Sequence, residues 1–139
     1  MFDKPFLILI SLILLMSCSE QKKPTEFKRL KIWEAIQVAA KEERINYLLE
    51  ISQDTLYCQC NEDRIPKEDF FSKHFDKMKQ PYNREYDVYE ERFKNVKGYN
   101  KRYRISYFDG GRGDETSSTI YTILVGEKGI KFLGVFSIP

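Results

Sequence analysis

The sequence predicts an α+β domain in which N-terminal helices pack on a curved antiparallel sheet of about four strands, arranged as a C-terminal meander. Two patterns carry this prediction. Apolar residues recur at helical spacings near the start of residues 26–139, whereas they alternate with polar residues in the C-terminal part. The chain has 139 residues, which suits a single domain, and residues 26–139 are predicted to form it.

Two helices are predicted between residues 26 and 51, where strong helix formers follow a polar segment. Apolar residues there are spaced by three, four and seven: Trp33, Ile36, Ala40, Tyr47, Leu48 and Ile51. The charged residues 41–44 interrupt this stripe, and we interpret them as a break between two helices rather than a turn of one. A further helix is predicted from Pro66, which suits the first helical position, to a stop before Pro81.

Strands are predicted in the rest of the domain. Residues 52–60 form a short extended segment, and a meander is predicted over residues 101–109, 118–125 and 130–136. The last of these strands is expected to alternate regularly, so that Val135 lies on the face opposite Phe132 and Phe136.

Residues 85–94 fit either a helix or a strand, because tyrosines at helical spacing occur in a segment rich in aromatic residues. We favour a strand that pairs with residues 101–109 and covers that edge of the sheet.

The N-terminus holds an apolar segment, residues 5–16, with one proline, one serine and otherwise only Phe, Leu, Ile and Met. It is shorter than the roughly twenty residues that a spanning helix needs. A buried core helix is the alternative, but the segment has no polar face to turn toward water. One basic residue, Lys4, precedes it, and small residues follow it beside Cys18. This order predicts a secretory signal peptide over residues 1–17.

The four residues Leu15-Met16-Ser17-Cys18 resemble the lipobox of bacterial lipoprotein precursors. The resemblance implies cleavage before Cys18, diacylglycerol on its thiol and usually a further acyl chain on the new N-terminus. Two or three acyl chains attach a protein stably, so the membrane is an expected partner. Ser19 is not the Asp that keeps such lipoproteins in the inner membrane of many Gram-negative bacteria, which implies the outer membrane, facing either the periplasm or the cell surface. Residues 18–25 are then a polar tether.

Two cysteines remain for the domain, Cys58 and Cys60, and an even number in an exported protein favours a disulfide. The C-x-C spacing closes a very small ring, which is strained compared with ordinary bridges. A static bridge, two free thiols and a redox-active pair all stay open. A zinc site made of Cys58, Cys60 and His74 is disfavoured, because thirteen residues separate Cys60 from His74, outside the usual ligand spacings. The prediction is therefore no metal.

No catalytic residue and no cofactor are predicted. The single histidine, His74, would have to serve any histidine-dependent mechanism, and it falls on the apolar face of a predicted helix. The net charge of the chain is only +2, whereas proteins that bind nucleic acid usually carry a clustered basic face, so nucleic acid is not an expected partner. Arg102 and Arg104 could meet an anionic ligand, but pairing with Asp87 or Glu91 on a neighbouring strand is the favoured interpretation.

Helices followed by a bent antiparallel sheet resemble the cystatin-like and nuclear-transport-factor-two-like architectures, in which the sheet wraps helices into a cone. This resemblance is topological and implies no functional residue. Together these features predict a non-enzymatic, lipid-anchored envelope protein that binds a protein or a small ligand, for example an immunity or accessory protein. The alternatives are a periplasmic enzyme, either a thiol–disulfide protein using Cys58 and Cys60 or a small-pocket enzyme, and a structural envelope component.

Overall fold

The computed structural model describes residues 29–60, 63–111 and 117–138. The predicted signal peptide, the tether and Cys18 lie outside these ranges. Among the described residues, no helix is both long enough and apolar enough to cross a bilayer.

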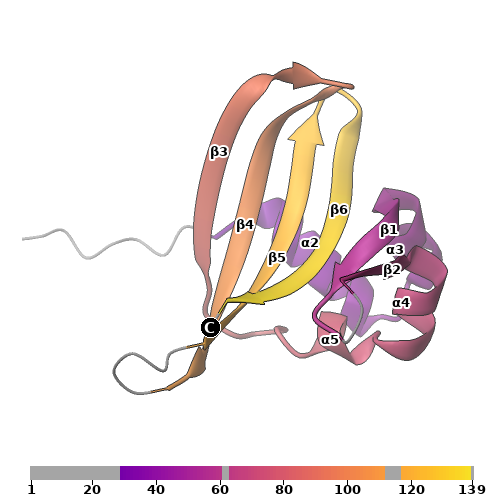
Figure 1. The fold of residues 1–139 in the computed structure, drawn as a ribbon, viewed down its shortest axis with the longest axis vertical. Helices are drawn as coiled ribbons and strands as arrows, with labels where there is room; N and C mark the ends of the chain where they lie inside the picture. Colours follow the sequence, from indigo (N-terminus) through magenta and orange to yellow (C-terminus); the bar gives the residue numbers. More distant parts are fainter. Residues whose placement is uncertain (1–28, 61–62, 112–116, 139) are drawn as a thin grey trace, which may run out of the picture.

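The described residues form helices and strands in a mixed order along the chain (Figure 1). The helices are α2 (Lys31–Lys41), α3 (Ile45–Ile51), α4 (Lys67–Lys73) and α5 (Asp76–Lys79). The strands are β1 (Ser52–Cys58), β2 (Arg64–Pro66), β3 (Asp87–Val96), β4 (Tyr99–Gly110), β5 (Ser117–Gly126) and β6 (Gly129–Ile138).

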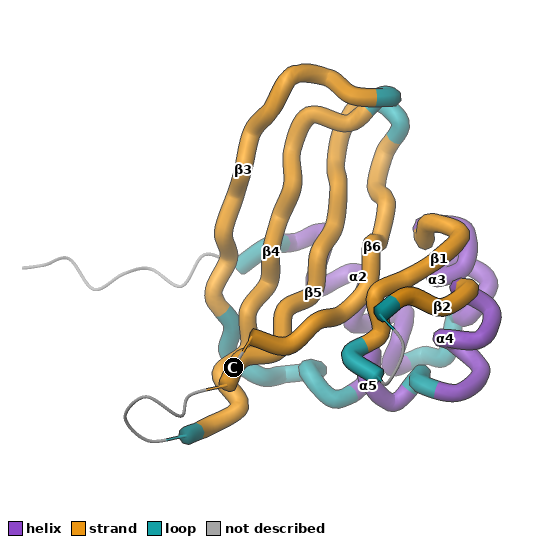
Figure 2. Tube along the Cα trace, viewed as in Figure 1, coloured by secondary structure: helices purple, strands orange, loops and turns teal. Residues whose placement is uncertain are grey.

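The strands make one curved, unclosed sheet in the order β2-β1-β6-β5-β4-β3 (Figure 2). Six strands replace the predicted four, because the segment 52–60 joins the sheet and brings β2 with it. β1 pairs with β6 in parallel, and the remaining pairs are antiparallel. The predicted α+β class and the C-terminal meander are therefore confirmed, whereas the strand number is wrong and the sheet is not antiparallel throughout.

The helices are not all N-terminal, which corrects the predicted layout. The break over residues 41–44 does separate α2 from α3, and Glu43 there has a left-handed backbone with φ of 56°. However, α4 and α5 follow β1 and β2 in the chain. They also replace the single helix predicted before Pro81, since the chain leaves helical geometry at His74, where φ is −127°. No glycine or proline marks this break in the sequence.

The segment 85–94 is a strand, as favoured: β3 pairs antiparallel with β4. The expected alternation in β6 is wrong, because its register with β5 shifts by one residue, pairing Phe132 with Ile123 and Gly134 with Thr122. Val135 therefore lies buried on the same face as Phe132. Gly134 permits the bulge: its φ is 124°, and a Cβ there would lie 2.3 Å from the carbonyl oxygen of Tyr57.

The core lies between α2 and one face of the sheet, which we call the inner face. Its residues on the long strands are buried: Tyr103, Ile105, Tyr107, Tyr121, Ile123, Phe132 and Val135. Helix α2 covers this face with Trp33, whose ring centroid lies 4.8 Å from that of Tyr121. Figure 1 shows α2 behind the long strands, so the sheet face toward the viewer is the opposite, outer face.

Candidate functional site

A pocket of about 680 Å³ opens beside α2, between this helix, the chain segment 81–86 that runs along it and the end of β4. Its volume falls in the range typical of small-molecule sites. The residues lining it combine aromatic rings with charged and amide groups: Arg29, Trp33, Glu34, Gln37, Val38, Pro81, Tyr82, Asn83, Arg84, Glu85, Tyr86 and Tyr107. Small ligands favour this mixture of an apolar wall and a few polar groups.

Two contacts hold the segment 81–86 across α2, one near each end of the helix. Lys41 donates a hydrogen bond to the hydroxyl of Tyr82 at 3.2 Å, and its ammonium group lies 4.3 Å from the centre of the same ring. The hydroxyl of Tyr86 accepts a hydrogen bond from the backbone N–H of Leu30 at 3.1 Å. The pocket is the space left between these two attachments.

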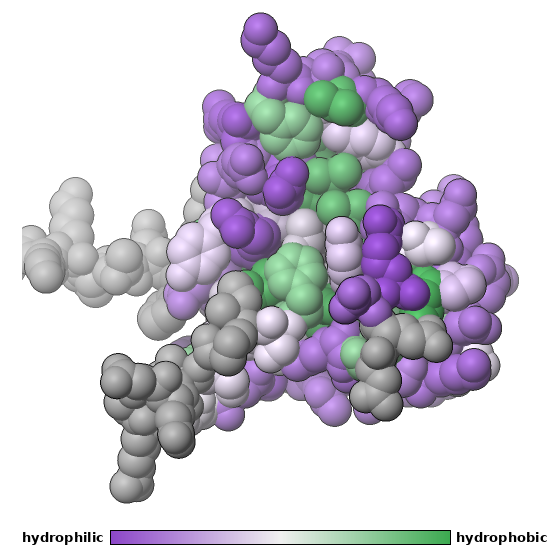
Figure 3. Space-filling view, in the orientation of Figure 1, coloured by the Kyte–Doolittle hydropathy of each residue, from purple (hydrophilic) through white to green (hydrophobic). Residues whose placement is uncertain are grey.

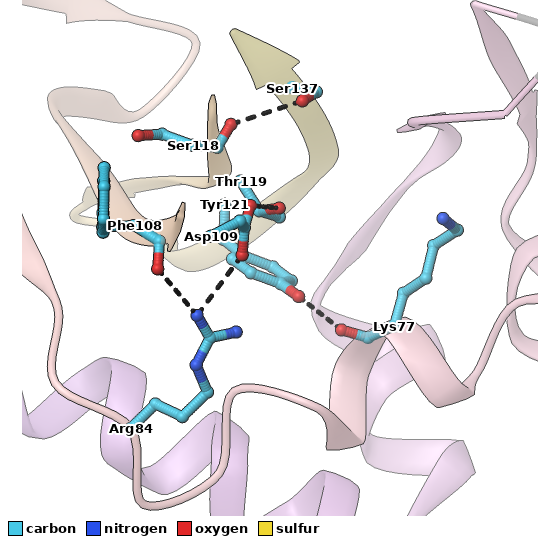
Figure 4. A network of polar contacts seen from close by, with 8 residues as sticks. All are labelled: Lys77, Arg84, Phe108, Asp109, Ser118, Thr119, Tyr121 and Ser137. Atoms are coloured by element: carbon cyan, nitrogen blue, oxygen red, sulfur yellow. Dashed lines mark hydrogen bonds and ion pairs between the residues drawn. The ribbon is translucent and has the colours of Figure 1, made fainter. Parts of the chain in front are cut away.

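Arg84 fixes the same segment to the sheet. Its guanidinium group donates to the carbonyl oxygen of Phe108 at 3.1 Å and to Asp109 at 3.3 Å, and Thr119 donates to the same carboxylate (Figure 4). The group also lies 5.2 Å from the ring centre of Tyr107. Because the guanidinium group of Arg84 is already paired, it forms part of the pocket wall and does not present an unpaired positive charge to a ligand.

Trp33 and Tyr107 form the inner end of the pocket. The indole N–H of Trp33 donates to the Tyr107 hydroxyl at 2.6 Å, and both side chains are almost completely buried. Burial raises the pKa of Tyr107 to about 12, against the smaller opposing effect of the Trp33 hydrogen bond. The tyrosine is therefore neutral at ordinary pH and keeps its own hydroxyl proton as a donor.

Gln37 is the unusual residue of the pocket wall. It lies on the buried stripe of α2 and is only 5% exposed, yet neither its amide nitrogen nor its amide oxygen has a hydrogen-bond partner among the described residues. Leaving buried polar groups unpaired costs about 1–3 kcal/mol. A donor and an acceptor are thus held side by side next to the pocket at a cost in stability.

The remaining charges at the pocket are of both signs. Arg29 lies 3.6 Å from the carboxylate of Glu34, and both side chains are substantially exposed. Together with the Arg84–Asp109 pair, this leaves no concentrated charge of one sign among the described residues at the mouth of the pocket. The electrostatics therefore favour an uncharged ligand over an anion.

The outer face of the sheet is partly apolar. Figure 3 shows green and white residues gathered over the middle of this face, with purple residues around them. Among the described residues, Phe108 and Tyr89 are the most exposed large hydrophobic side chains, at 61% and 57%. On the same face Arg102 pairs with Glu91 at 3.6 Å, as the sequence favoured, while Arg104 lies opposite Tyr89 in the register.

A second cluster lies at the end of β1. Cys58 and Cys60 are joined by a disulfide, with their Cα atoms 5.2 Å apart. The sequence spacing argued against a part for His74, but the fold brings one of its ring nitrogens within 4.8 Å of both sulfur atoms. Lys77 donates to the carbonyl oxygen of Gln59, the residue between the cysteines, at 3.2 Å. The cluster therefore combines two sulfurs, an imidazole and a nearby cation.

Sequence reasoning did not find Gln37 or Arg84. A signal for Gln37 was present: it follows Trp33 by four residues and Ile36 by one, so it occupies a core position of the helical stripe. A polar residue at such a position is either paired or functional. Arg84 carried no comparable signal, because its partners Phe108 and Asp109 on β4 become its neighbours only through the fold.

Comparison with known proteins assigns no family to the chain. No family model matches it, and no curated protein matches it. One solved structure, the designed protein Rd1NTF2_05 in a variant with five substitutions, is similar over 78% of this chain and 94% of its own, with 9% identity and a TM-score of 0.47. A similarity of this size carries no argument about function.

Proposed function

We propose that the chain is the precursor of a lipid-anchored bacterial envelope protein whose domain binds a small ligand without catalysing a reaction. The anchor rests on the sequence Leu15-Met16-Ser17-Cys18, with Cys18 as the lipid attachment site and residues 18–25 as the tether. The outer membrane is the proposed location, with the domain facing the periplasm or the cell surface. The domain itself is proposed to belong to the cone-shaped architecture of nuclear-transport-factor-two-like proteins.

One observation carries the binding proposal: the buried, unpaired amide of Gln37 in the wall of a pocket of about 680 Å³. A ligand that supplies one acceptor and one donor would satisfy both amide atoms. Since each net hydrogen bond is worth about 0.5–1.5 kcal/mol, two of them would distinguish such a ligand from an apolar one of the same shape. Gln37 must turn its amide toward the pocket to make them, because both atoms now lie below the surface.

The other groups of the wall narrow the ligand class. The half-buried rings of Tyr82 and Tyr86 provide aromatic surface on the wall, with the buried rings of Trp33 and Tyr107 beneath it, which favours a planar ligand. The paired charges of Arg29 and Arg84 favour a neutral one. We therefore propose a planar, uncharged molecule with a carboxamide or lactam edge, which presents a donor beside an acceptor.

Trp33 makes the proposal testable, because it is the single tryptophan of the chain and lines the pocket. We expect benzamide, used as a probe, to change the fluorescence of Trp33 in a saturable way. Gln37→Leu should weaken this binding by about tenfold or more, through the loss of two hydrogen bonds. Gln53→Leu is the matched control, since Gln53 lies on β1 and bonds the carbonyl of Leu133 instead. Equal binding of benzamide to the wild type and to Gln37→Leu would refute the proposal, and tighter binding of benzoate would refute the neutral ligand class.

The anchor has its own test. Replacing Cys18 by Ser in the producing bacterium should prevent both processing and recovery of the protein in the membrane fraction. Unchanged processing and unchanged membrane association would contradict the lipoprotein proposal and leave the pocket proposal intact.

A thiol–disulfide enzyme is the second candidate function, and the Cys58–Cys60 disulfide beside Lys77 is the observation that favours it. A nearby cation stabilises a thiolate, which is the reactive form of cysteine. The test is the reduction of an insulin disulfide by the chain in the presence of a small thiol. A rate equal to that of a Cys58→Ala/Cys60→Ala variant would exclude this activity.

A further inference from the structure

The end of β1 turns back on itself between the two cysteines. Cys58 is the last residue of the strand and is fully buried, whereas Cys60 is half-buried. Gln59 between them has a left-handed backbone with φ of 47°, which is uncommon for a residue other than glycine. This turn directs the side chains of Cys58 and Cys60 toward one another.

His74 reaches the same place from another element. It caps the C-terminal end of α4, a helix whose Phe70 and Phe71 are buried in the core. Its ring lies 6.4 Å from the ring of Phe70 and is half-buried. The position of the imidazole is thus set by packing, and the break between α4 and α5 at this residue leaves it at the edge of the cluster.

Two thiolates and an imidazole are preferred ligands of Zn²⁺, with bond lengths of about 2.3 Å to sulfur and about 2.0–2.1 Å to nitrogen. Tetrahedral geometry at those lengths places the donor atoms roughly 3.3–3.8 Å from one another. The three donor atoms here lie within 4.8 Å of one another, so the imidazole has to approach the sulfurs by about an ångström. The two sulfurs, which are bonded to each other, have to separate to roughly 3.8 Å once the disulfide is reduced. Neither sulfur can act as a thiolate ligand while the disulfide is closed.

We propose that Cys58, Cys60 and His74 form a redox-controlled Zn²⁺ site, closed to the metal when the disulfide is formed and open when it is reduced. A dithiol protein is the proposed reductant: it transfers two electrons and two protons, its own thiols become a disulfide, and the S–S bond of Cys58–Cys60 becomes two thiols. Zn²⁺ then displaces the two thiol protons and binds both thiolates and the imidazole, with solvent in the fourth position. A protein that carries a disulfide is the proposed oxidant: it accepts two electrons from the thiolates and two protons from solvent, its own disulfide becomes two thiols, the Cys58–Cys60 bond forms again and Zn²⁺ is released.

Lys77 contributes to the balance between the two states. Its ammonium group is held at the carbonyl of Gln59, which places a positive charge beside the two cysteines. The positive charge of Lys77 disfavours a neighbouring site with a net positive charge. Zn²⁺ bound by two thiolates carries no net charge, so it is compatible with Lys77 at this position. This site is separate from the pocket at α2 and does not depend on the ligand proposed for it.

The test uses the full chain with Cys18→Ser, in which Cys58 and Cys60 are the only thiols left. Zn²⁺ is titrated against a coloured chelator before and after reduction with a phosphine, and Co²⁺ serves as the spectroscopic probe. We expect no binding by the oxidised chain and one ion per reduced chain, with the sulfur-to-cobalt and tetrahedral bands that thiolate ligation produces. His74→Gln should weaken binding at least by the roughly 10–100-fold that even outer-shell partners contribute.

The controls separate a built site from simple chelation by two thiols. His74 is half-buried at a helix end, so His74→Gln is expected to fold, and circular dichroism checks this. Equal Zn²⁺ affinity of the reduced wild type and of His74→Gln would overturn the proposal, as would binding by the oxidised chain. Failure of the phosphine to reduce the disulfide without unfolding the protein would overturn it too, because the site must open within the native fold.

Discussion

The pocket joins three parts of the chain that are far apart in sequence, α2, the segment 81–86 and the end of β4, whereas the cysteine cluster uses only residues between Cys58 and Lys77. The two sites also differ in whether their functional groups have partners. In the pocket, Gln37 is buried with both amide atoms unpaired. In the cluster, the two sulfur atoms are bonded to each other. The pocket therefore holds a functional group that lowers stability, while the cluster holds one in a form that adds to it.

Trp33 should give the largest effect, because the pocket wall and the core both depend on it. Trp33→Ala removes a fully buried indole, its contact with Tyr121 and its hydrogen bond to Tyr107. We expect the free energy of unfolding to fall by about 3–5 kcal/mol, measured by urea denaturation followed by circular dichroism. Trp33→Phe keeps most of the packing and should lose clearly less. Similar losses in the two variants would mean that the hydrogen bond, and not the packing, dominates.

Replacing Gln37 should raise the free energy of unfolding, whereas replacing Trp33 should lower it. Gln37→Leu replaces an unpaired buried amide by an apolar side chain of similar length, so we expect a gain of about 1–3 kcal/mol in the free energy of unfolding. Gln53→Leu should instead lose about 1 kcal/mol, because Gln53 donates a hydrogen bond to the carbonyl of Leu133 at 3.1 Å. Thermal denaturation of the two variants beside the wild type measures both. A loss of stability in Gln37→Leu would show that the amide is satisfied in the native protein.

The Cys58–Cys60 disulfide should change the free energy of unfolding by less than the substitutions at Trp33 and Gln37. A bridge across a single intervening residue constrains the unfolded chain little, so its reduction should lower the free energy of unfolding by about 1.5 kcal/mol or less. Urea denaturation with and without a phosphine measures the difference, and Cys58→Ala/Cys60→Ala should not respond to the phosphine. A loss of several kcal/mol on reduction would indicate that the cluster, like Trp33, supports the core.

These two regions also differ in how far the sequence predicts them. The strand 101–109 follows from alternation, and the strand 118–125 follows from a run of β-branched and apolar residues. The break between α2 and α3 follows from the charged residues 41–44, because local pattern decides all three. The parallel pairing of β1 with β6 could not be predicted, since it depends on a bulge at Gly134 and on contacts between distant segments. The even number of cysteines favoured a Cys58–Cys60 disulfide, whereas the spacing argued against the approach of His74, which the packing of α4 brings about.

The smallest effect concerns an ion pair that links α5, on the side of the cysteine cluster, to the turn between α2 and α3. Lys79 donates to the carboxylate of Glu43, and this hydrogen bond, with the charge of Lys79, lowers the pKa of Glu43 below its ordinary value of 4.5. Because the folded state has the lower pKa, the pair stabilises the fold above pH 4.5 and loses this effect as the pH falls through the lowered value. Both groups are exposed, so salt should weaken the effect further. A double-mutant cycle of Glu43→Gln and Lys79→Met should show a small coupling energy at neutral pH and none in acid; an equal coupling at both would mean that the two side chains interact by packing rather than by charge.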